Sequence, residues 1–337
     1  DPMKTIIQTL IDKGHAYEKD GHVLFNVPSM AEYGKLSRRK RDELIAGARV
    51  EVAPYKKDPA DFVLWKPSDP AKGEPGWDSA WGFGRPGWHI ECSAMSRAHL
   101  GEIFDIHGGG LDLIFPHHEN EIAQSRCAHD APTMANYWMH NGYLMAEGEK
   151  MSKSLGNFYT VNELLQVFPG EAIRLLLLKT HYRQPLDFTK DGLVEAKREL
   201  DGFYQALRQA GDAPIEGDVP PAFIDALSDD LNTPKAISLM HEALSHANKG
   251  DKAAQGTLRA CGALVGLLQQ PPESWFRWQP TGAVEGLSDD DIDARIIART
   301  EARKNKDFAT SDAIRDELQA AGIVLEDGAG TTTWRRG

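Results

Sequence analysis

An alternation of helix and strand patterns begins at residue 88, and it constrains the fold more than any other feature of the chain. Its predicted members, in order, are a helix at about 88–100, a strand at Ile103–His107, a turn at Gly108–Gly110 and a helix at about 117–129. Alternation of this kind builds a parallel sheet with helices packed against it. Residues 28–87 are instead interrupted by proline, glycine and charged residues, which predicts an irregular inserted subdomain.

The remainder of the chain is predicted to be mostly helical. An apolar stripe in the region from about 191 to 270 marks the core-facing side of a helix. It consists of Leu193, Leu200, Phe203, Tyr204 and Leu207. A linker at 271–287 precedes a small unit with helices at Asp291–Asn305 and Ser311–Ala321 and two short strands. A chain of 337 residues is long enough for two or three domains.

Composition limits the class of protein. The net charge of −12 argues against wholesale wrapping of nucleic acid, although it leaves room for a local basic face. All apolar runs are far shorter than the roughly 20 residues that cross a bilayer, so we expect no membrane span. The three cysteines are too few and too scattered for a disulfide framework. They suit a reducing cytoplasm, where a cysteine is free to bind a metal.

Four side chains form a candidate metal site: Cys92, His117, His118 and Glu121. Glu121 follows His117 by four residues, which places both side chains on one face of a helix. Thiolate, imidazole and carboxylate are zinc ligands, and three protein ligands with an open position are typical of catalytic zinc. Spacing does not choose between the two histidines. The alternative interpretation is a buried cysteine near a solvated helix start.

A basic loop is predicted at Lys150–Ser154, which reads Lys-Met-Ser-Lys-Ser. Flexible ammonium groups can follow the charge that develops on phosphate oxygens as pyrophosphate departs. A solvated basic loop is the alternative. The loop is followed directly by Leu155-Gly156-Asn157 and preceded by the β/α region, and these neighbours favour an ATP-binding role.

Together these segments resemble the cysteinyl-tRNA synthetase family, which belongs to the class I aminoacyl-tRNA synthetases. The resemblance spans the whole chain. The stretches that carry it are Gly87–Met95, Phe104–Ser125, Lys150–Asn157, Ser228–Pro234 and Gly322–Arg336.

The resemblance implies a zinc-dependent amino-acid pocket. Cys92, His117 and Glu121 match three of the family's four protein ligands to one zinc ion per chain, and the substrate sulfur then coordinates that zinc. Trp88 and His107 match residues that line the pocket.

The same resemblance settles the choice between the two histidines, which spacing leaves open, and it also specifies the carboxylate. It makes His117 rather than His118 the imidazole ligand, and Glu121 rather than Glu119 the carboxylate. His89 lies nearby in sequence, and it is a candidate to orient a ligand or to face the substrate.

The implied reaction is the ATP-dependent attachment of L-cysteine to tRNA(Cys). The cysteine carboxylate attacks the α-phosphate of ATP to give cysteinyl-adenylate, and a terminal ribose hydroxyl of the tRNA then takes the cysteinyl group. Zinc favours a thiolate over a hydroxyl, so serine is rejected without an editing site. Lys150 and Lys153 are the implied catalytic residues, and Lys153 also contacts ATP, which is bound with Mg²⁺.

Contacts with tRNA are expected at the end of the chain. Arg295, Arg299 and Arg303 recur at four-residue intervals on one predicted helix. Charge patterning alone leaves a solvated helix face equally open. The resemblance, in which this end of the chain reads the anticodon, favours tRNA. We expect the protein to be a monomer.

One signature of the family is missing from the sequence. The first nucleotide-binding motif, His-Ile-Gly-His, is absent, and with it the family's upstream cysteine ligand and first β/α half. We therefore expect an N-terminally truncated chain that lacks roughly a hundred residues, about one small domain, and is inactive alone.

The predicted fold is α/β followed by mostly α. It comprises the second half of a class I Rossmann-type nucleotide-binding domain with an inserted subdomain, a helical bundle and a small α+β C-terminal domain. The predicted domains are a connective-peptide insertion at 1–81, the Rossmann-type half at 82–136, a stem-contact region with the lysine loop at 137–192, the tRNA-binding helical bundle at 193–284 and an anticodon-recognition domain at 285–337.

Three other functions fit part of the sequence. The cysteine:amino-sugar ligase of mycothiol synthesis shares the zinc site and lysine loop but uses no anticodon domain, so Gly322–Arg336 argues against it. A non-catalytic tRNA-binding fragment would shift tRNA in a gel without supporting cysteine-dependent ATP–pyrophosphate exchange. A zinc hydrolase would cleave an ester without ATP.

Overall fold

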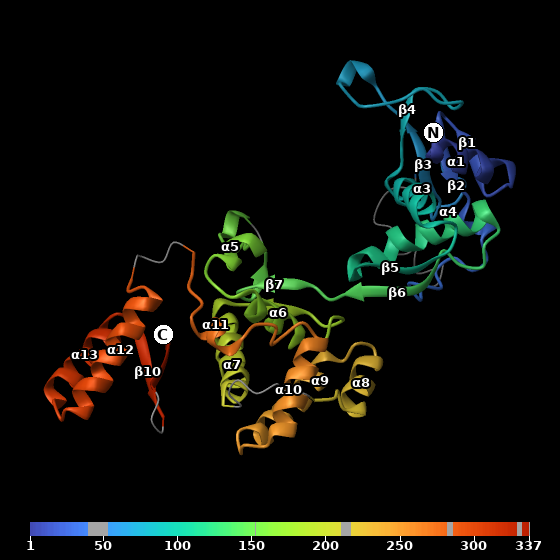
Figure 1. Cartoon of the computed structure of the whole chain (residues 1–337). Helices are drawn as coiled ribbons and strands as arrows, with labels where there is room; N and C mark the ends of the chain where they lie inside the picture. The colour runs from blue at the N-terminus through green and yellow to red at the C-terminus, as the bar shows by residue number, and fades with distance from the viewer. Residues whose placement is uncertain (40–52, 152, 210–216, 282–285, 329–331, 337) are drawn as a thin grey trace. The chain divides into compact units, whose positions relative to one another are not determined.

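The computed structural model describes residues 1–39, 53–151, 153–209, 217–281, 286–328 and 332–336. The chain divides into two compact units, Asp1–Tyr143 and Leu144–Gly337 (Figure 1). Every helix among the described residues is too short or too polar to span a membrane.

The first unit opens with helix α1 (Pro2–Asp12) and a four-stranded antiparallel sheet. The strands pair in chain order, as β1 (Ala16–Lys19), β2 (His22–Phe25), β3 (Phe62–Pro67) and β4 (Gly84–Pro86). The expectation of an irregular subdomain at 28–87 is therefore wrong for β3 and β4. Both strands are short and end in proline. Whether such a segment forms a strand depends more on pairing with neighbouring strands than on its local sequence pattern.

The second part of this unit carries the β/α alternation. Its elements are α3 (Trp88–Leu100), β5 (Phe104–Gly110), a 3₁₀ turn η3 (Leu111–Leu113), a π-turn η4 (Ile114–His118), α4 (Glu119–His129) and β6 (Ala135–Asn141). Strands β5 and β6 pair in parallel, so the predicted parallel sheet is confirmed for these two strands. Helices α1, α3 and α4 pack together around buried Ile7, Leu10 and Ile90.

The glycines at the end of β5 are strand residues. A turn was predicted at Gly108–Gly110, and that prediction is wrong because the three glycines continue the parallel ladder with β6. A Cβ on Gly109 would lie 2.8 Å from Cδ1 of Leu113 and 3.0 Å from Cε1 of His118. Glycine here allows the strand to approach the turn that carries the histidines.

The second unit begins with a small sheet in the order β8-β7-β9. Its strands are β7 (Leu144–Ala146), β8 (Glu149–Lys150) and β9 (Leu186–Phe188), with the 3₁₀ turn η5 (Lys153–Leu155) and helices α5 (Val161–Leu165) and α6 (Gly170–Leu178) between β8 and β9. Strands β7 and β8 form an antiparallel hairpin, while β7 and β9 pair in parallel.

Five further helices build the core of this unit. They are α7 (Lys190–Arg208), α8 (Pro221–Ser228), α9 (Thr233–Ala247), α10 (Lys252–Leu264) and α11 (Pro272–Phe276). The predicted apolar stripe on α7 is confirmed, because all five of its members are buried. They pack against buried residues of α6, α8, α9 and α10 in one continuous core.

The end of the chain forms a helix pair and a hairpin. Helices α12 (Asp289–Lys304) and α13 (Phe308–Ala320) pack on the antiparallel strands β10 (Ile323–Asp327) and β11 (Thr332–Arg336). Helix α12 starts two residues earlier than predicted, because Ser288 and Asp291 form a capping box at its N-terminus.

Leu200→Ala tests the packing of α7. Because Leu200 is fully buried, we expect the free energy of unfolding of the second unit to fall by about 2–5 kcal/mol, measured by urea denaturation. Val194 lies on the same helix but is 37% exposed, so Val194→Ala is expected to change it by no more than about 0.5 kcal/mol. Equal effects of the two substitutions would contradict the observed orientation of α7.

Candidate metal centre and lysine loop

Cys92, His117 and Glu121 meet in the interior of the first unit. Cys92 projects from α3, His117 from the π-turn η4 and Glu121 from the first turn of α4. One ligand atom from each lies within 4.8 Å of the others, and Nε2 of His117 is 3.4 Å from Oε1 of Glu121. Glu121 is completely buried and His117 is 5% exposed. The predicted ligands are therefore close enough to hold one ion together.

The charges of this group favour a bound cation. Oε1 of Glu121 is buried, and it has no hydrogen-bond partner among the described residues. Burial and the neighbouring Glu121 carboxylate raise the pKa of the Cys92 thiol to about 11. An unsatisfied buried oxygen is costly, and a thiol must lose its proton to bind a metal. A divalent cation would satisfy the oxygen and stabilise the thiolate, and the sulfur, nitrogen and oxygen donor set fits zinc.

The second oxygen of Glu121 faces a different partner. Nε2 of His107 lies 2.7 Å from Oε2 of Glu121, and Nε2 of His118 lies 4.0 Å from the same oxygen. His118 is in turn held by His140, whose Nε2 is 2.8 Å from Nδ1 of His118. Burial, followed by the charge of His107, lowers the pKa of His118 to about 3, so this imidazole is neutral at pH 7. These contacts fix the direction of the carboxylate, as outer partners of a metal ligand do.

The geometry separates the two histidines, which spacing could not, and it also separates Glu121 from Glu119. His117 shares a three-ligand group with Cys92, whereas His118 groups with His107. Glu119 points elsewhere, because its carboxylate accepts hydrogen bonds from the backbone of Gly34 and Ser37. The role of the three predicted ligands stays a prediction, but it is one that the distances permit.

Aromatic rings flank His117. The ring of Trp88 stacks on His117 with centroids 4.5 Å apart, and Trp88 is 60% exposed. Nδ1 of His89 lies 2.8 Å from Nδ1 of His117. Burial, followed by the charge of His117, lowers the pKa of His89 to about 4. Trp88 therefore offers an exposed aromatic face beside the ligand group. His89 contacts the His117 ring through a ring nitrogen.

His140 was not predicted from sequence. It lies on β6 directly opposite Gly109 of β5, and this register brings it to His118. Local sequence does not indicate this role for His140, because only the pairing of two parallel strands places it near the π-turn.

The lysine loop lies in the second unit. Lys150 ends strand β8 and is exposed, Lys153 begins the turn η5, and Ser152 lies outside the described residues. The side-chain amide of Asn157 donates to the carbonyl oxygens of Ala146 and Lys150, at 3.0 and 3.3 Å. This amide bridges the two strands of the hairpin from which the loop extends.

A capping contact also fixes the hairpin turn. The backbone N–H of Gly148 donates to Oδ1 of Asp187 on β9, at 2.9 Å. The loop therefore extends from a frame that is tied to the neighbouring strand.

The three predicted tRNA-binding arginines differ in exposure. Arg299 is 4% exposed, and its guanidinium donates to both carboxylate oxygens of Asp327, at 2.7 and 2.8 Å. Arg303 is exposed and lies 3.4 Å from Asp327, while Nε of Arg295 donates to Glu317 at 2.7 Å. Arg299 therefore fastens α12 to β10, and only Arg295 and Arg303 remain candidates for phosphate contacts.

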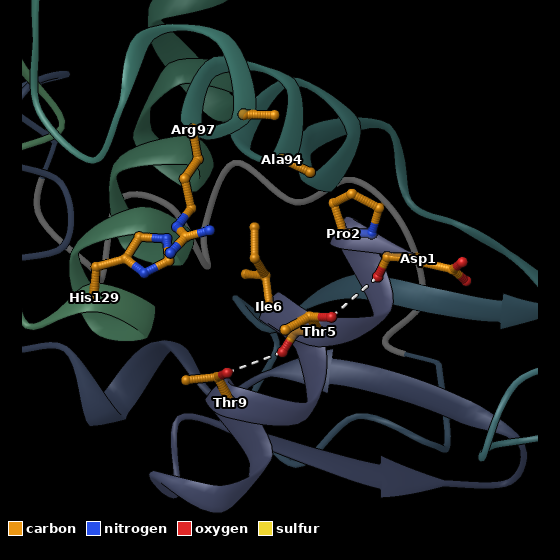
Figure 2. A pocket seen from close by; sticks show the side chains of 9 residues that line it. Asp1, Pro2, Thr5, Ile6, Thr9, Ala94, Arg97 and His129 are labelled. Atoms are coloured by element: carbon orange, nitrogen blue, oxygen red, sulfur yellow. Dashed lines mark hydrogen bonds between the residues drawn. The ribbon is translucent and has the colours of Figure 1, made fainter.

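A separate cavity of about 420 Å³ lies beside α1, α3 and α4 in the first unit. Figure 2 shows Arg97 and His129 side by side on one side of it, with Thr5 and Thr9 of α1 on the other. None of the predicted site residues lines this cavity. This cavity therefore lies apart from the candidate ligand group.

Comparison with known proteins assigns the class of the chain. Residues 1–198 match the family model described as the tRNA synthetases class I (C) catalytic domain. Residues 222–270 match the DALR domain, and residues 288–335 match the anticodon-binding domain of cysteinyl-tRNA ligase. The chain is thus a class I aminoacyl-tRNA synthetase with α/β and then helical parts. The five narrower domain boundaries predicted from sequence stay a prediction.

Curated relatives identify the family within that class. Cysteine–tRNA ligase of Paramagnetospirillum magneticum is 62% identical, over 99% of this chain and 74% of its own. Cysteine–tRNA ligase of Rhodospirillum rubrum is 61% identical, over 99% of this chain and 73% of its own. The chain belongs to the cysteine–tRNA ligase family. The family is that of a ligase that attaches cysteine to tRNA, and it implies tRNA, an amino acid and ATP with Mg²⁺ as partners.

Among solved structures, methionyl-tRNA synthetase of Mycobacterium tuberculosis has a TM-score of 0.44 at 13% identity, over 81% of this chain and 64% of that chain. A likeness at this level adds nothing to the family assignment.

Cys92→Ala tests the metal centre. Loss of an outer partner already weakens metal binding by about 10–100-fold, so we expect loss of a ligand to weaken zinc binding by at least about 100-fold. Cys127→Ala is the matched control, because Cys127 is buried on α4 of the same unit and outside the ligand group. Zinc affinity is measured by competition with a chromogenic chelator. Equal affinity of the Cys92→Ala protein and the parent would refute the site.

Proposed function

We propose that the chain acts in the attachment of L-cysteine to tRNA(Cys) through cysteinyl-adenylate, with zinc selecting the substrate thiol. The observation that carries the proposal is the group of Cys92, His117 and Glu121, in which one buried carboxylate oxygen lacks a hydrogen bond of good geometry from the described residues. Family membership supports the overall reaction, and the chemistry of this group supports the means of selection.

The difficulty of the reaction lies in choosing cysteine over serine. The two side chains are nearly isosteric, and an apolar pocket separates such a pair by only about 100-fold. A zinc ion held by the three side chains supplies a soft Lewis acid that prefers a thiolate to a hydroxyl. The residues around it then have to hold the ligands in place and admit the substrate.

The surrounding side chains have distinct proposed roles. His107 donates to Oε2 of Glu121 and leaves Oε1 to face Cys92 and His117. Trp88 covers one face of the His117 ring and presents its other surface outward as a wall for the amino acid. We assign Trp88 and His107 to substrate binding on this basis.

The lysine loop is assigned to ATP. Lys150 and Lys153 stabilise the negative charge that develops on the β- and γ-phosphates of Mg²⁺-bound ATP as pyrophosphate leaves. The loop extends from a hairpin tied by Asn157 and by Asp187, so its ends are fixed while the residues between them reach the nucleotide.

Of the earlier alternatives, the amino-sugar ligase is the most similar in chemistry. The match of residues 288–335 to an anticodon-binding domain does not favour it, because a small amino sugar has no anticodon.

Binding of free amino acids tests the selection mechanism. The zinc-loaded chain is expected to bind L-cysteine more than about 100-fold more tightly than L-serine, beyond what shape alone provides. Isothermal titration measures both affinities, and the chelator-treated chain is the control that should lose the difference. Equal binding of the two amino acids to the zinc-loaded chain would contradict the proposal.

The salt dependence of tRNA binding tests Arg295 and Arg303. We expect Arg295→Gln and Arg303→Gln each to reduce the slope of log affinity against log salt by about 1, because each removes one phosphate contact. Fluorescence anisotropy with labelled tRNA measures the slope. Unchanged slopes in both variants would rule out these contacts.

Arg299→Gln is the contrasting variant. It is expected to lower the free energy of unfolding by about 1.5–3 kcal/mol, because it breaks charge-assisted hydrogen bonds at a buried position. The folded protein of this variant should keep the parent's slope of log tRNA affinity against log salt concentration.

A further inference from the structure

Glu119 is a buried charge with no role in the ligand group. It is 1% exposed, and Oε1 and Oε2 accept hydrogen bonds from the backbone N–H groups of Gly34 and Ser37, at 2.9 and 2.8 Å. Both donors belong to residues 30–39, which we call the strap. A buried carboxylate needs such donors, and here they come from a segment more than eighty residues away.

Further contacts fasten the strap along the same helix. The hydroxyl of Tyr33 donates to the side-chain oxygen of Asn120, and Arg126 pairs with Glu32, both at 2.5 Å. The guanidinium of Arg39 lies over the ring of Phe115, 4.8 Å from its centroid. The strap therefore contacts α4 near its start and two turns later, and it also contacts the π-turn.

The strap has a second route to the metal ligands. The ring of Tyr33 stacks with Phe62, and Phe62 meets His89 edge-on, with centroids 6.3 and 6.0 Å apart. His89 in turn contacts His117 through their Nδ1 atoms.

The start of α4 lacks support of its own. In the part of the chain that the structure describes, no side chain caps its N-terminus, and a π-turn with one non-helical residue, Phe115, precedes it. Successive residues of a helix are 100° apart, so Glu119 projects from the face opposite to Glu121 and His117. The strap thus contacts the first turn of α4 on the face opposite to the one that carries His117 and Glu121.

We propose that Glu119 is a positioning residue of the metal centre, which docks the strap and thereby fixes the first turn of α4 with His117 and Glu121 in place. This inference rests on the proposed function, because it requires a metal to be held there. It assigns Glu119 no contact with substrate or metal.

Zinc release to a chelator and the visible spectrum of the cobalt-loaded chain test the role of Glu119. Glu119→Ala is expected to speed zinc release by about 10–100-fold, as loss of an outer support does, and to change the cobalt ligand-field bands. Asp61→Ala is the matched control, since Asp61 is also a fully buried carboxylate of this unit that accepts a backbone N–H, from Val27. It is expected to lower the melting temperature while zinc release at 25 °C and the cobalt spectrum stay as in the parent.

Gly34→Ala disturbs the same contact from the side of the strap. Gly34 has a φ of +96°, and a Cβ there would lie 2.4 Å from the backbone oxygen of Arg39, so alanine distorts the strap. It should speed zinc release as Glu119→Ala does. The double variant should release zinc no faster than the faster of the two single variants, because both substitutions remove the same contact.

The outcomes separate this inference from the proposed function. If the parent holds zinc but Glu119→Ala behaves like Asp61→Ala, or if the Glu119 and Gly34 effects simply add, the positioning role is wrong and the metal centre stands. If the parent chain holds no zinc, both fail.

Discussion

The buried carboxylate of Glu121 is the interaction on which the site depends. One oxygen is held by His107, and the other faces Cys92 and His117 and lacks a hydrogen bond of good geometry from the described residues. A positive charge beside this oxygen would stabilise the buried carboxylate. Three elements must therefore meet within a few ångströms: α3 with the thiol, β5 with His107, and the turn that leads into α4.

Several local features of the first unit allow these three elements to approach one another. Gly109 has no side chain where a Cβ would contact Leu113 and His118, so β5 can lie against the π-turn. The β5–β6 register places His140 behind His118. Glu119 and the strap hold the far side of α4. The ligands themselves are few, and much of the surrounding sequence keeps them in position.

Local pattern predicted the elements but not the contacts between them. The helix at 88–100 and the apolar stripe on α7 are confirmed, because helical periodicity and core burial are read from neighbouring residues. The glycine turn was wrong because Gly108–Gly110 are strand residues only by virtue of pairing with β6. Strands β3 and β4 were missed for the same reason.

The site shows the same division. Spacing found Cys92, His117 and Glu121, yet it could not exclude His118, since both histidines are close enough to reach Glu121. Only the fold turns Glu119 towards the strap and His118 towards His140. Likewise, the regular spacing of the arginines gave no sign that Arg299 is buried against Asp327, because that partner lies on a strand 28 residues away.

X-ray absorption at the zinc edge tests the central claim most directly, because it counts the sulfur atoms bound to the metal. The account predicts one sulfur at about 2.3 Å in the zinc-loaded chain and a second one on addition of L-cysteine, with no change on addition of L-serine. A zinc environment without sulfur, or one that L-cysteine leaves unchanged, would contradict it.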